Sequence, residues 1–224
     1  MPTRLLIAIT YIARLQPIME KTMLNLNLKK TMLSFTLITA LGTFGAIPAK
    51  AAWQSVEHAS SLSFISIKKN AIAETHEFKN FEANVNDSGE VTVKIDLTSV
   101  NTGIDIRDNR MQEMLFETSK FSEAVLTATL PNGLLASLVP GEMKQFNLDG
   151  KLELHGQARM VTISCAVFME AKDKLVVTST QPTVIQAAEF SLLDGIKQLA
   201  DIAGLDAIAS AIPVSFVLTL EDMK

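Results

Sequence analysis

Residues 91–97 read VTVKIDL, a stretch in which apolar and polar side chains alternate at every position. Because successive side chains of a β-strand point to opposite faces, this alternation predicts a strand with one buried face and one face in water. The turn-forming sequence NDSG at positions 86–89 precedes it, and a second alternating stretch, FEANV at 81–85, comes before that turn. Strand, tight turn and strand in this order predict a β-hairpin.

The same period of two continues along most of the chain, and several of these stretches are separated only by short turns, such as the one at His155 and Gly156. We expect about eight strands, which cover residues 62–67, 78–85, 91–97, 124–130, 146–154, 161–167, 175–185 and 214–220. Short connections between sequential strands favour an antiparallel meander over a parallel α/β sheet. Closing such a sheet leaves no exposed edge, so the sequence predicts an all-β fold, an eight-stranded antiparallel β-barrel.

Two stretches interrupt the alternation with helical spacing. Residues 104–116 place Met111 and Met114 three positions apart, beside a charged run. Residues 191–204 repeat apolar side chains every three or four positions and end at Gly204, a residue typical of helix ends. We therefore predict one or two helices in addition to the strands, each with an apolar face that covers the barrel.

The charge of the 224-residue chain is divided unevenly along its length. Residues 1–51 carry a net charge of +5, whereas residues 52–224 hold 14 basic and 23 acidic side chains, a net charge of −9. An acidic domain without a basic cluster argues against nucleic acid as a partner. Trp53 is the single tryptophan and residues 52–224 contain no tyrosine, which argues against a barrel embedded in a membrane through aromatic girdles.

The first part of the chain has the pattern of a secretory leader. Residues 29–51 contain two lysines, then an uncharged apolar run, then the sequence PAKA. This predicts a signal peptide over residues 23–51, with cleavage after Ala51, and residues 1–22 then reflect a start assigned too far upstream. An uncleaved membrane anchor is the alternative. Cleavage predicts an exported domain, residues 52–224, in a bacterial periplasm and without a membrane span.

Several short motifs occur in a characteristic order along this domain. They are HAS at 58–60 followed by Phe64, HEFKNF at 76–81, SVNTG at 99–103 followed by IRD at 106–108, GKLELHG at 150–156, and the helical stretch and strand start at 190–213. In this order they resemble the YceI-like family of exported, lipocalin-like proteins. The sequence departs from the family pattern at HE, where a glycine is usual, and lacks the Arg-x-x-Phe-Gly motif near its end.

The resemblance implies a lipocalin-like barrel whose apolar cavity holds a polyisoprenoid or a similar amphiphile. The residues by themselves leave a packed interior and a hollow interior equally open. The resemblance favours the hollow one, with the helix from Ser191 as a wall or lid. We expect the cavity to be lined by these side chains: Phe64, Phe78, Phe81, Val93, Ile95, Met111, Met114, Leu126, Phe146, Phe168, Leu192, Ile196, Leu199 and Phe216.

The sequence predicts no catalytic residue, no metal site and no cofactor. Cys165 is the only cysteine, which excludes an internal disulfide, and it lies in an apolar strand, where cysteine is usually a small hydrophobic residue. His58, His76 and His155 have none of the spacings known for metal ligands. No glycine-rich phosphate loop is present.

We therefore expect a non-enzymatic protein that binds, transports or sequesters an isoprenoid-like or other amphiphilic lipid in the periplasm. Two alternatives stay open. One is a small-barrel isomerase or hydrolase, which needs a protonatable side chain inside the barrel, and His58, His76 and Glu77 are the candidates. The other is a stress-response or adhesion module with a filled core.

The charged run at 107–110 could position a polar headgroup at the barrel mouth, but a solvated helix face is the favoured interpretation.

Overall fold

The structure is a computed structural model that describes residues 51–223. The predicted signal peptide and the residues before it therefore lie outside the described residues, apart from Ala51 at the expected cleavage site. The strands are β1 (Ala51–Ser55), β2 (Ser61–Lys68), β3 (Ile72–Phe78), β4 (Phe81–Asn86), β5 (Glu90–Asp96), β6 (Val100–Asn101), β7 (Glu123–Thr129), β8 (Met143–Leu154), β9 (Gln157–Ala171), β10 (Lys174–Ser179), β11 (Thr183–Gln186) and β12 (Ala211–Asp222).

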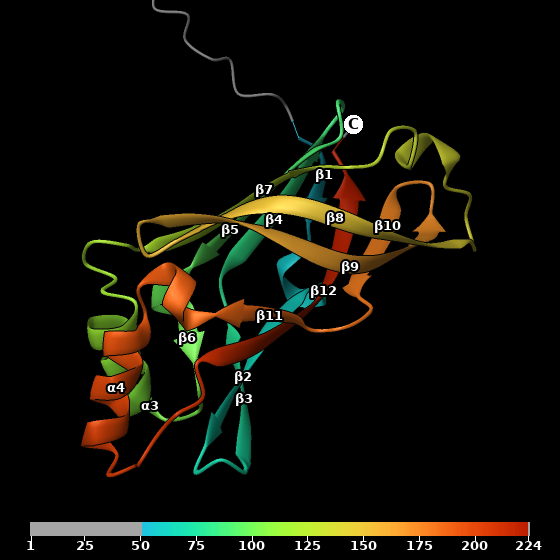
Figure 1. The fold of residues 1–224 in the computed structure, drawn as a ribbon. Coiled ribbons are helices and arrows are strands. Elements are labelled where there is room, and N and C mark those ends of the chain that lie inside the picture. The colour runs from blue at the N-terminus through green and yellow to red at the C-terminus, as the bar shows by residue number, and fades with distance from the viewer. Residues whose placement is uncertain (1–50, 224) are drawn as a thin grey trace, which may run out of the picture. The chain divides into compact units, whose positions relative to one another are not determined.

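These strands form a closed antiparallel barrel (Figure 1). Eight of them make the ring, in the order β1-β4-β5-β7-β8-β9-β10-β12, and β12 closes it by pairing with β1. The remaining strands extend this ring at its lower end, where β2 pairs with both β12 and β3. The predicted eight-stranded antiparallel barrel is confirmed.

Two of the predicted strands are each divided into two. The stretch predicted over residues 78–85 is broken at Lys79 and Asn80, whose backbone N–H groups donate to the carbonyl and the hydroxyl oxygen of Ser99 instead of to a neighbouring strand ladder. The stretch over 175–185 is broken between β10 and β11. β4 and β10 belong to the ring, whereas β11 pairs with β12 and β3 pairs with β2. Only Phe78 of the first predicted stretch lies in β3, and residues 72–77 of that strand were not predicted.

The predicted hairpin turns are present. Asn86 Oδ1 accepts from the backbone N–H groups of Ser88 and Glu90, and Gly89 has a φ of +83°. Between β8 and β9, His155 and Gly156 have φ angles of +50° and +72°. A two-residue hairpin turn needs this left-handed pair, since it matches the twist of the flanking strands.

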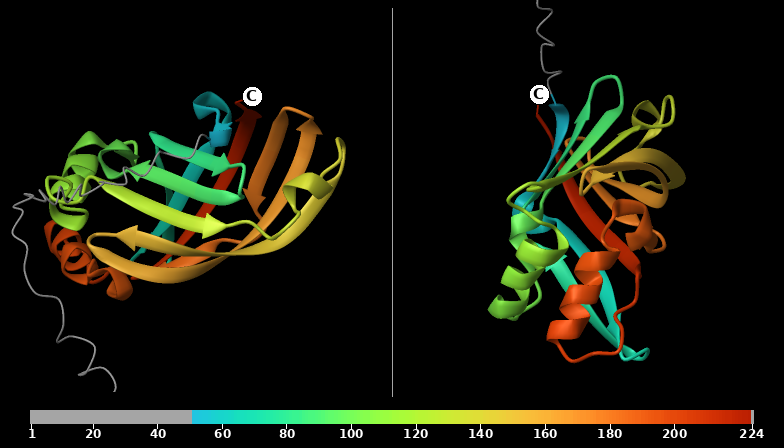
Figure 2. Two further views of the ribbon diagram at one scale, coloured as in Figure 1. Left: turned by 90° about the horizontal axis from the view of Figure 1, so that it is seen from above. Right: turned by 60° about the vertical axis from the view of Figure 1, so that its left-hand side comes forward.

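Both predicted helical stretches are helical. Helix α3 (Asp105–Arg110) continues into a π-helical turn, η3 (Met111–Leu115), and α4 (Leu193–Ile202) precedes β12. The two helices lie side by side at one end of the barrel (Figure 2). A Cβ added to Gly195 would lie 2.5 Å from the carbonyl oxygen of Met114, so the backbones of α4 and η3 are in direct contact.

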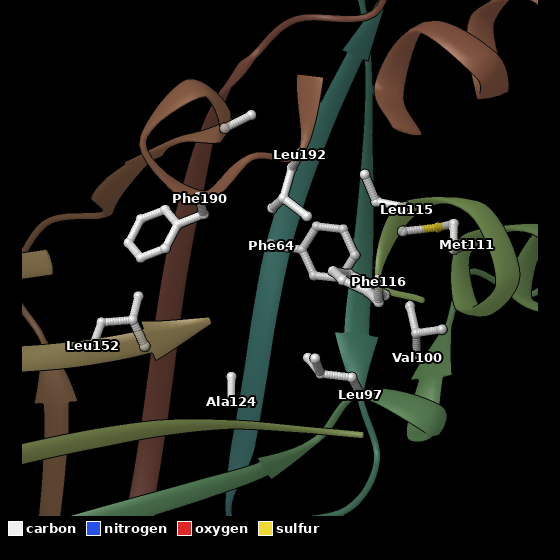
Figure 3. Packing of buried hydrophobic residues seen from close by; sticks show 11 residues of the cluster. Phe64, Leu97, Val100, Met111, Leu115, Phe116, Ala124, Leu152, Phe190 and Leu192 are labelled. Carbon is white, nitrogen blue, oxygen red and sulfur yellow. The ribbon is translucent and has the colours of Figure 1, made fainter. Parts of the chain in front are cut away.

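Buried apolar side chains gather in three clusters, the smallest of which contains Leu148, Ile163 and Cys165. The helical-end cluster (Figure 3) contains Phe64, Leu97, Val100, Met111, Leu115, Phe116, Ala124, Leu152, Ala187, Phe190 and Leu192. The distal cluster contains Ala83, Val85, Val91, Leu138, Val167, Met169, Leu175 and Leu220. The distal end is covered by the β7–β8 connection, which includes the 3₁₀ turn η4 (Leu135–Ser137). The space between the clusters forms the candidate site.

Candidate ligand cavity

The barrel is hollow. Its interior encloses a cavity of about 410 Å³, within the usual size range of small-molecule sites. The walls are the inward faces of the strands, for example Val91, Val93 and Ile95 at alternate positions of β5. The sequence left a packed and a hollow interior equally open, and the structure has the hollow one. Most of the lining is aliphatic or aromatic, so the cavity suits an apolar guest.

Most of the side chains predicted to line the cavity do line it. They are Phe64, Phe78, Phe81, Val93, Ile95, Met111, Leu126, Phe146, Leu192, Ile196, Leu199 and Phe216. The wall formed by α4 uses Leu192, Ile196, Leu199 and Ala203, whose spacing of three and four places them on one face of the helix.

Phe168 and Met114 do not line the cavity, which corrects their expected placement. Phe168 is 38% exposed on the outer face of β9, because its neighbours Val167 and Met169 are the ones that point inward. Met114 lies in the π-helical turn, in which the N–H of Phe116 donates to the carbonyl of Met111 over 2.9 Å. That turn presents Met111 and its neighbour Leu115 to the cavity and directs Met114 elsewhere.

Three leucines of the β7–β8 connection line the cavity although the sequence did not lead us to expect them there. Leu134, Leu135 and Leu138, from the β7–β8 connection, contribute to its lining, and Leu138 is buried in the distal cluster. The signal was a loop with an unusually apolar sequence, GLLASLV at 133–139, between two strands of opposite direction. A connection exposed to water is seldom so rich in leucine.

The helical end of the cavity differs from the rest because it is polar. Along β2 the inward-facing residues change from Leu62 and Phe64 to Ser66 and Lys68. Along β3, the neighbouring strand, they change from Phe78 through His76 to Glu74. Arg107 and Arg110 of α3 join them there. The cavity therefore has an apolar interior and one polar end, which we call the polar mouth.

One carboxylate organises most of the charge at the polar mouth. Glu74 Oε2 lies 2.9 Å from Lys68 Nζ and 2.9 Å from Arg107 Nη1. Arg107 Nη2 also donates to the carbonyl of Thr102, over 2.7 Å. The hydrogen bond from Lys68 lowers the pKa of Glu74, with a further contribution from the charge of Arg107, so Glu74 is ionised at neutral pH.

His76 is the most buried polar residue of the mouth, with 4% of its surface exposed. Its Nε2 lies 2.8 Å from Ser66 Oγ, and its ring lies 5.2 Å from that of Phe64. Its Nδ1 is buried without a hydrogen-bond partner in the described part of the chain. Burial, followed by the positive charge of Arg107, lowers the pKa of His76, so the imidazole is neutral at neutral pH.

Little of this arrangement fits an enzyme. Ser66 and His76 have the separation of a nucleophile and its base, but a working pair also needs a third group that orients the imidazole through its other nitrogen. Of the other enzymatic candidates, His58 is exposed in the 3₁₀ turn η1 (Glu57–Ala59), and Glu77 is exposed and accepts from Asn101 Nδ2. Burial raises the pKa of Cys165 to about 11, so its thiol is protonated.

Residues 51–223 show neither a metal-binding cluster nor a helix that could span a membrane. Histidine, cysteine and acidic side chains do not gather anywhere in this range in a group of three that could hold a metal ion. None of its helices combines the length and the hydropathy needed to span a bilayer.

Two solved structures resemble this one over the whole barrel. A polyisoprenoid binding domain from Saccharophagus degradans, described as implicated in plant cell wall breakdown, is 36% identical, with a TM-score of 0.75 over 77% of this chain and 99% of that one. Burkholderia cenocepacia BcnA is 18% identical, with a TM-score of 0.57 over 74% of this chain and 98% of that one, and this likeness concerns the fold alone. No curated protein matches the sequence.

The sequence pattern of one domain family matches the barrel almost from end to end. The match to the YceI-like domain runs from residue 53 in β1 to residue 220 in β12, and so includes every strand of the ring and both helices. The fold, the order of the motifs and the related structure from Saccharophagus degradans agree with that match. The chain therefore belongs to the YceI-like family.

Proposed function

We propose that this protein binds an isoprenoid-like lipid or a similar amphiphile inside its barrel and transports or sequesters it in the periplasm. The observation that carries the proposal is the cavity of about 410 Å³ with almost wholly apolar walls. The related Saccharophagus degradans structure, a polyisoprenoid binding domain by description, supports the choice of ligand class.

The volume of the cavity limits how much of a chain it can hold. A longer chain can enter only as far as the cavity of about 410 Å³ extends, and carbon atoms beyond that limit stay in water. Burying one isoprene unit contributes on the order of 3 kcal/mol. Association itself costs at least about 4 kcal/mol, so several buried units are needed before apolar burial alone gives measurable affinity without any specific hydrogen bond.

A series of prenyl alcohols tests this proposal directly. We expect the affinity to rise roughly a hundredfold for each added isoprene unit from geraniol to farnesol, and to level off for chains longer than the cavity. Binding can be measured by competition with a fluorescent lipid or by calorimetry. An affinity independent of chain length would contradict binding of the chain inside the barrel.

We propose binding rather than catalysis because only one of the enzymatic candidates, His76, lies in the cavity wall. The hydrolase alternative therefore reduces to Ser66 and His76. It predicts release of alcohol from a prenyl ester, at a rate that Ser66→Ala abolishes. Tight prenol binding together with no ester turnover by wild-type protein would favour the carrier.

The periplasmic location rests on the leader and not on the barrel. The full chain, expressed in a Gram-negative host, should appear in the periplasmic fraction with Ala52 as its first residue. Retention in the cytoplasm, or a mature protein that keeps residues 23–51, would contradict the proposed export and cleavage.

A further inference from the structure

We infer that the polar mouth is a subsite for an anionic headgroup, a phosphate or a carboxylate, carried by the apolar chain that the barrel holds. Arg110, Arg107 and His76 are the residues that would receive it. The inference rests on the proposed lipid binding and adds the chemical class of the ligand's polar end.

The polar mouth carries more positive than negative side chains. The cavity lining contains three cationic side chains, Lys68, Arg107 and Arg110, and one carboxylate, Glu74. A second carboxylate, Asp108 of α3, acts on the charge of His76 but does not line the cavity, and it accepts a hydrogen bond from the N–H of Thr102. This local excess of positive charge belongs to a domain, residues 52–224, whose net charge is −9. Glu74 is already shared by Lys68 and Arg107.

Arg110 is the cation left over. It is half-buried and lines the cavity, yet within residues 51–223 its guanidinium has neither an ion pair nor a hydrogen bond. A guanidinium presents parallel N–H donors that match the oxygens of a carboxylate or a phosphate. An anion at the mouth would supply the partner that Arg110 lacks.

The polar mouth also contains buried polar atoms that lack hydrogen-bond partners. His76 Nδ1 and Arg107 Nε are both buried without a partner in the part of the chain that the structure describes. Buried polar atoms are rarely left unpaired in native proteins, because such an atom forfeits its bonds to water. If Ser66 Oγ donates to His76 Nε2, the imidazole proton lies on Nδ1 and is available to donate to a ligand oxygen.

Only one end of the cavity is polar, which gives a bound amphiphile a preferred orientation. The inward faces of β2 and β3 become polar only toward the end that carries Lys68 and Glu74, whereas the opposite end is closed by the leucines of the β7–β8 connection. An amphiphile therefore has one favourable orientation, with its chain in the barrel and its headgroup between β2, β3 and α3. All the unpaired groups described above lie at that end.

Ligands with the same chain and different headgroups separate these contributions. Farnesol, farnesyl phosphate and farnesoic acid would be bound to wild-type protein and to two variants. Arg110→Gln removes the unpaired cation. The matched control, Lys94→Gln, removes the same charge from an exposed position on the outer face of β5.

We expect wild type to bind at least one of the two anionic ligands about tenfold to a hundredfold more tightly than farnesol, as is typical of hydrogen bonds to a charged group. Arg110→Gln should abolish most of that preference while leaving farnesol affinity unchanged, and Lys94→Gln should alter neither. Preference for phosphate or for carboxylate identifies which headgroup the mouth accepts.

Three outcomes would overturn the inference in distinguishable ways. Equal affinity of all three ligands for wild type would leave the apolar cavity as a lipid site but remove the anionic subsite. An equal loss of all three ligands in Arg110→Gln would make Arg110 a structural residue. Failure of wild type to bind any of the three would contradict the proposed function itself.

Discussion

Replacing Val177 with phenylalanine measures how empty the middle of the barrel is. Val177 lies in β10, between Val167 of β9 and Leu218 of β12, and its side chain faces the cavity. Phenylalanine adds four carbon atoms at this point. In a closely packed core such an enlargement destabilises a protein by about 1–3 kcal/mol, because neighbouring side chains must move. In a hollow core the ring enters free space.

The expected gain follows from the area that the ring removes from water. Four carbons at roughly 0.8 kcal/mol each contribute about 3 kcal/mol, and ordering the side chain costs about 0.5–1 kcal/mol. The net stabilisation of about 2 kcal/mol raises Tm by roughly 4–8 °C for a domain of this size. The same four carbons occupy cavity space that the lipid would otherwise fill, so the lipid loses room for nearly one isoprene unit and binds roughly a hundredfold more weakly.

The assay combines urea unfolding with binding of geranylgeraniol, and Val176→Phe provides the control. Val176 is the preceding residue of β10, but it lies outside the cavity lining and pairs with the outward-facing Phe168. We expect that variant to change stability by no more than about 0.5 kcal/mol and to leave binding unchanged. A Val177→Phe protein that is less stable than wild type and binds the lipid equally well would refute the reasoning.

Three further predictions concern other parts of the fold. Gly195→Ala should lower stability by about 1–3 kcal/mol in thermal unfolding, although alanine favours helices, because its Cβ would lie 2.5 Å from the carbonyl oxygen of Met114; a stabilised variant would contradict the close contact of α4 with η3. Cys165 lines the cavity with its pKa raised to about 11, so it should react slowly with a thiol reagent at pH 8 because little thiolate is present, and labelling as fast as that of a free thiol would contradict the raised pKa. Burial lowers the pKa of folded His76, so the unfolded chain takes up a proton first as the pH falls below 6.5, and the free energy of unfolding should decline from that pH downward. His76→Asn should lack this part of the decline, and equal slopes of unfolding free energy against pH for the two proteins would disprove it.

Local alternation in the sequence predicts most of the ring. The stretches at 91–97, 124–130, 146–154 and 161–167 correspond to β5, β7, β8 and β9, since a strand with one face in the interior must alternate its side chains. Alternation also decides the position of Phe168, which has the opposite parity to Val167 and so cannot share its inward face. The alternation in the sequence therefore places Phe168 on the outer face of β9, although the hydrophobicity of this residue alone suggested the cavity.

The path of the chain is harder to predict where hydrogen bonds from distant residues compete with the sheet. Ser99 satisfies the N–H groups of Lys79 and Asn80, and that contact divides one predicted strand into β3 and β4. The prediction for Met114 was wrong for a different, local reason. A π-helical turn changes the angle between successive side chains, and the spacing of Met111 and Met114 does not predict such a turn.

By itself the sequence determined most strands and both helical stretches, because these depend on the periodicity of neighbouring positions. It did not indicate β1, whose pairing with β12 closes the ring. Only the tertiary structure decided that the barrel is hollow, because an empty centre depends on the circumference of the closed ring and on how far side chains reach across it. It also decided that Lys68, Glu74, Arg107 and Arg110 meet at one end of the cavity. Residues so far apart in the chain are brought together by strand pairing and helix packing, which no local pattern records.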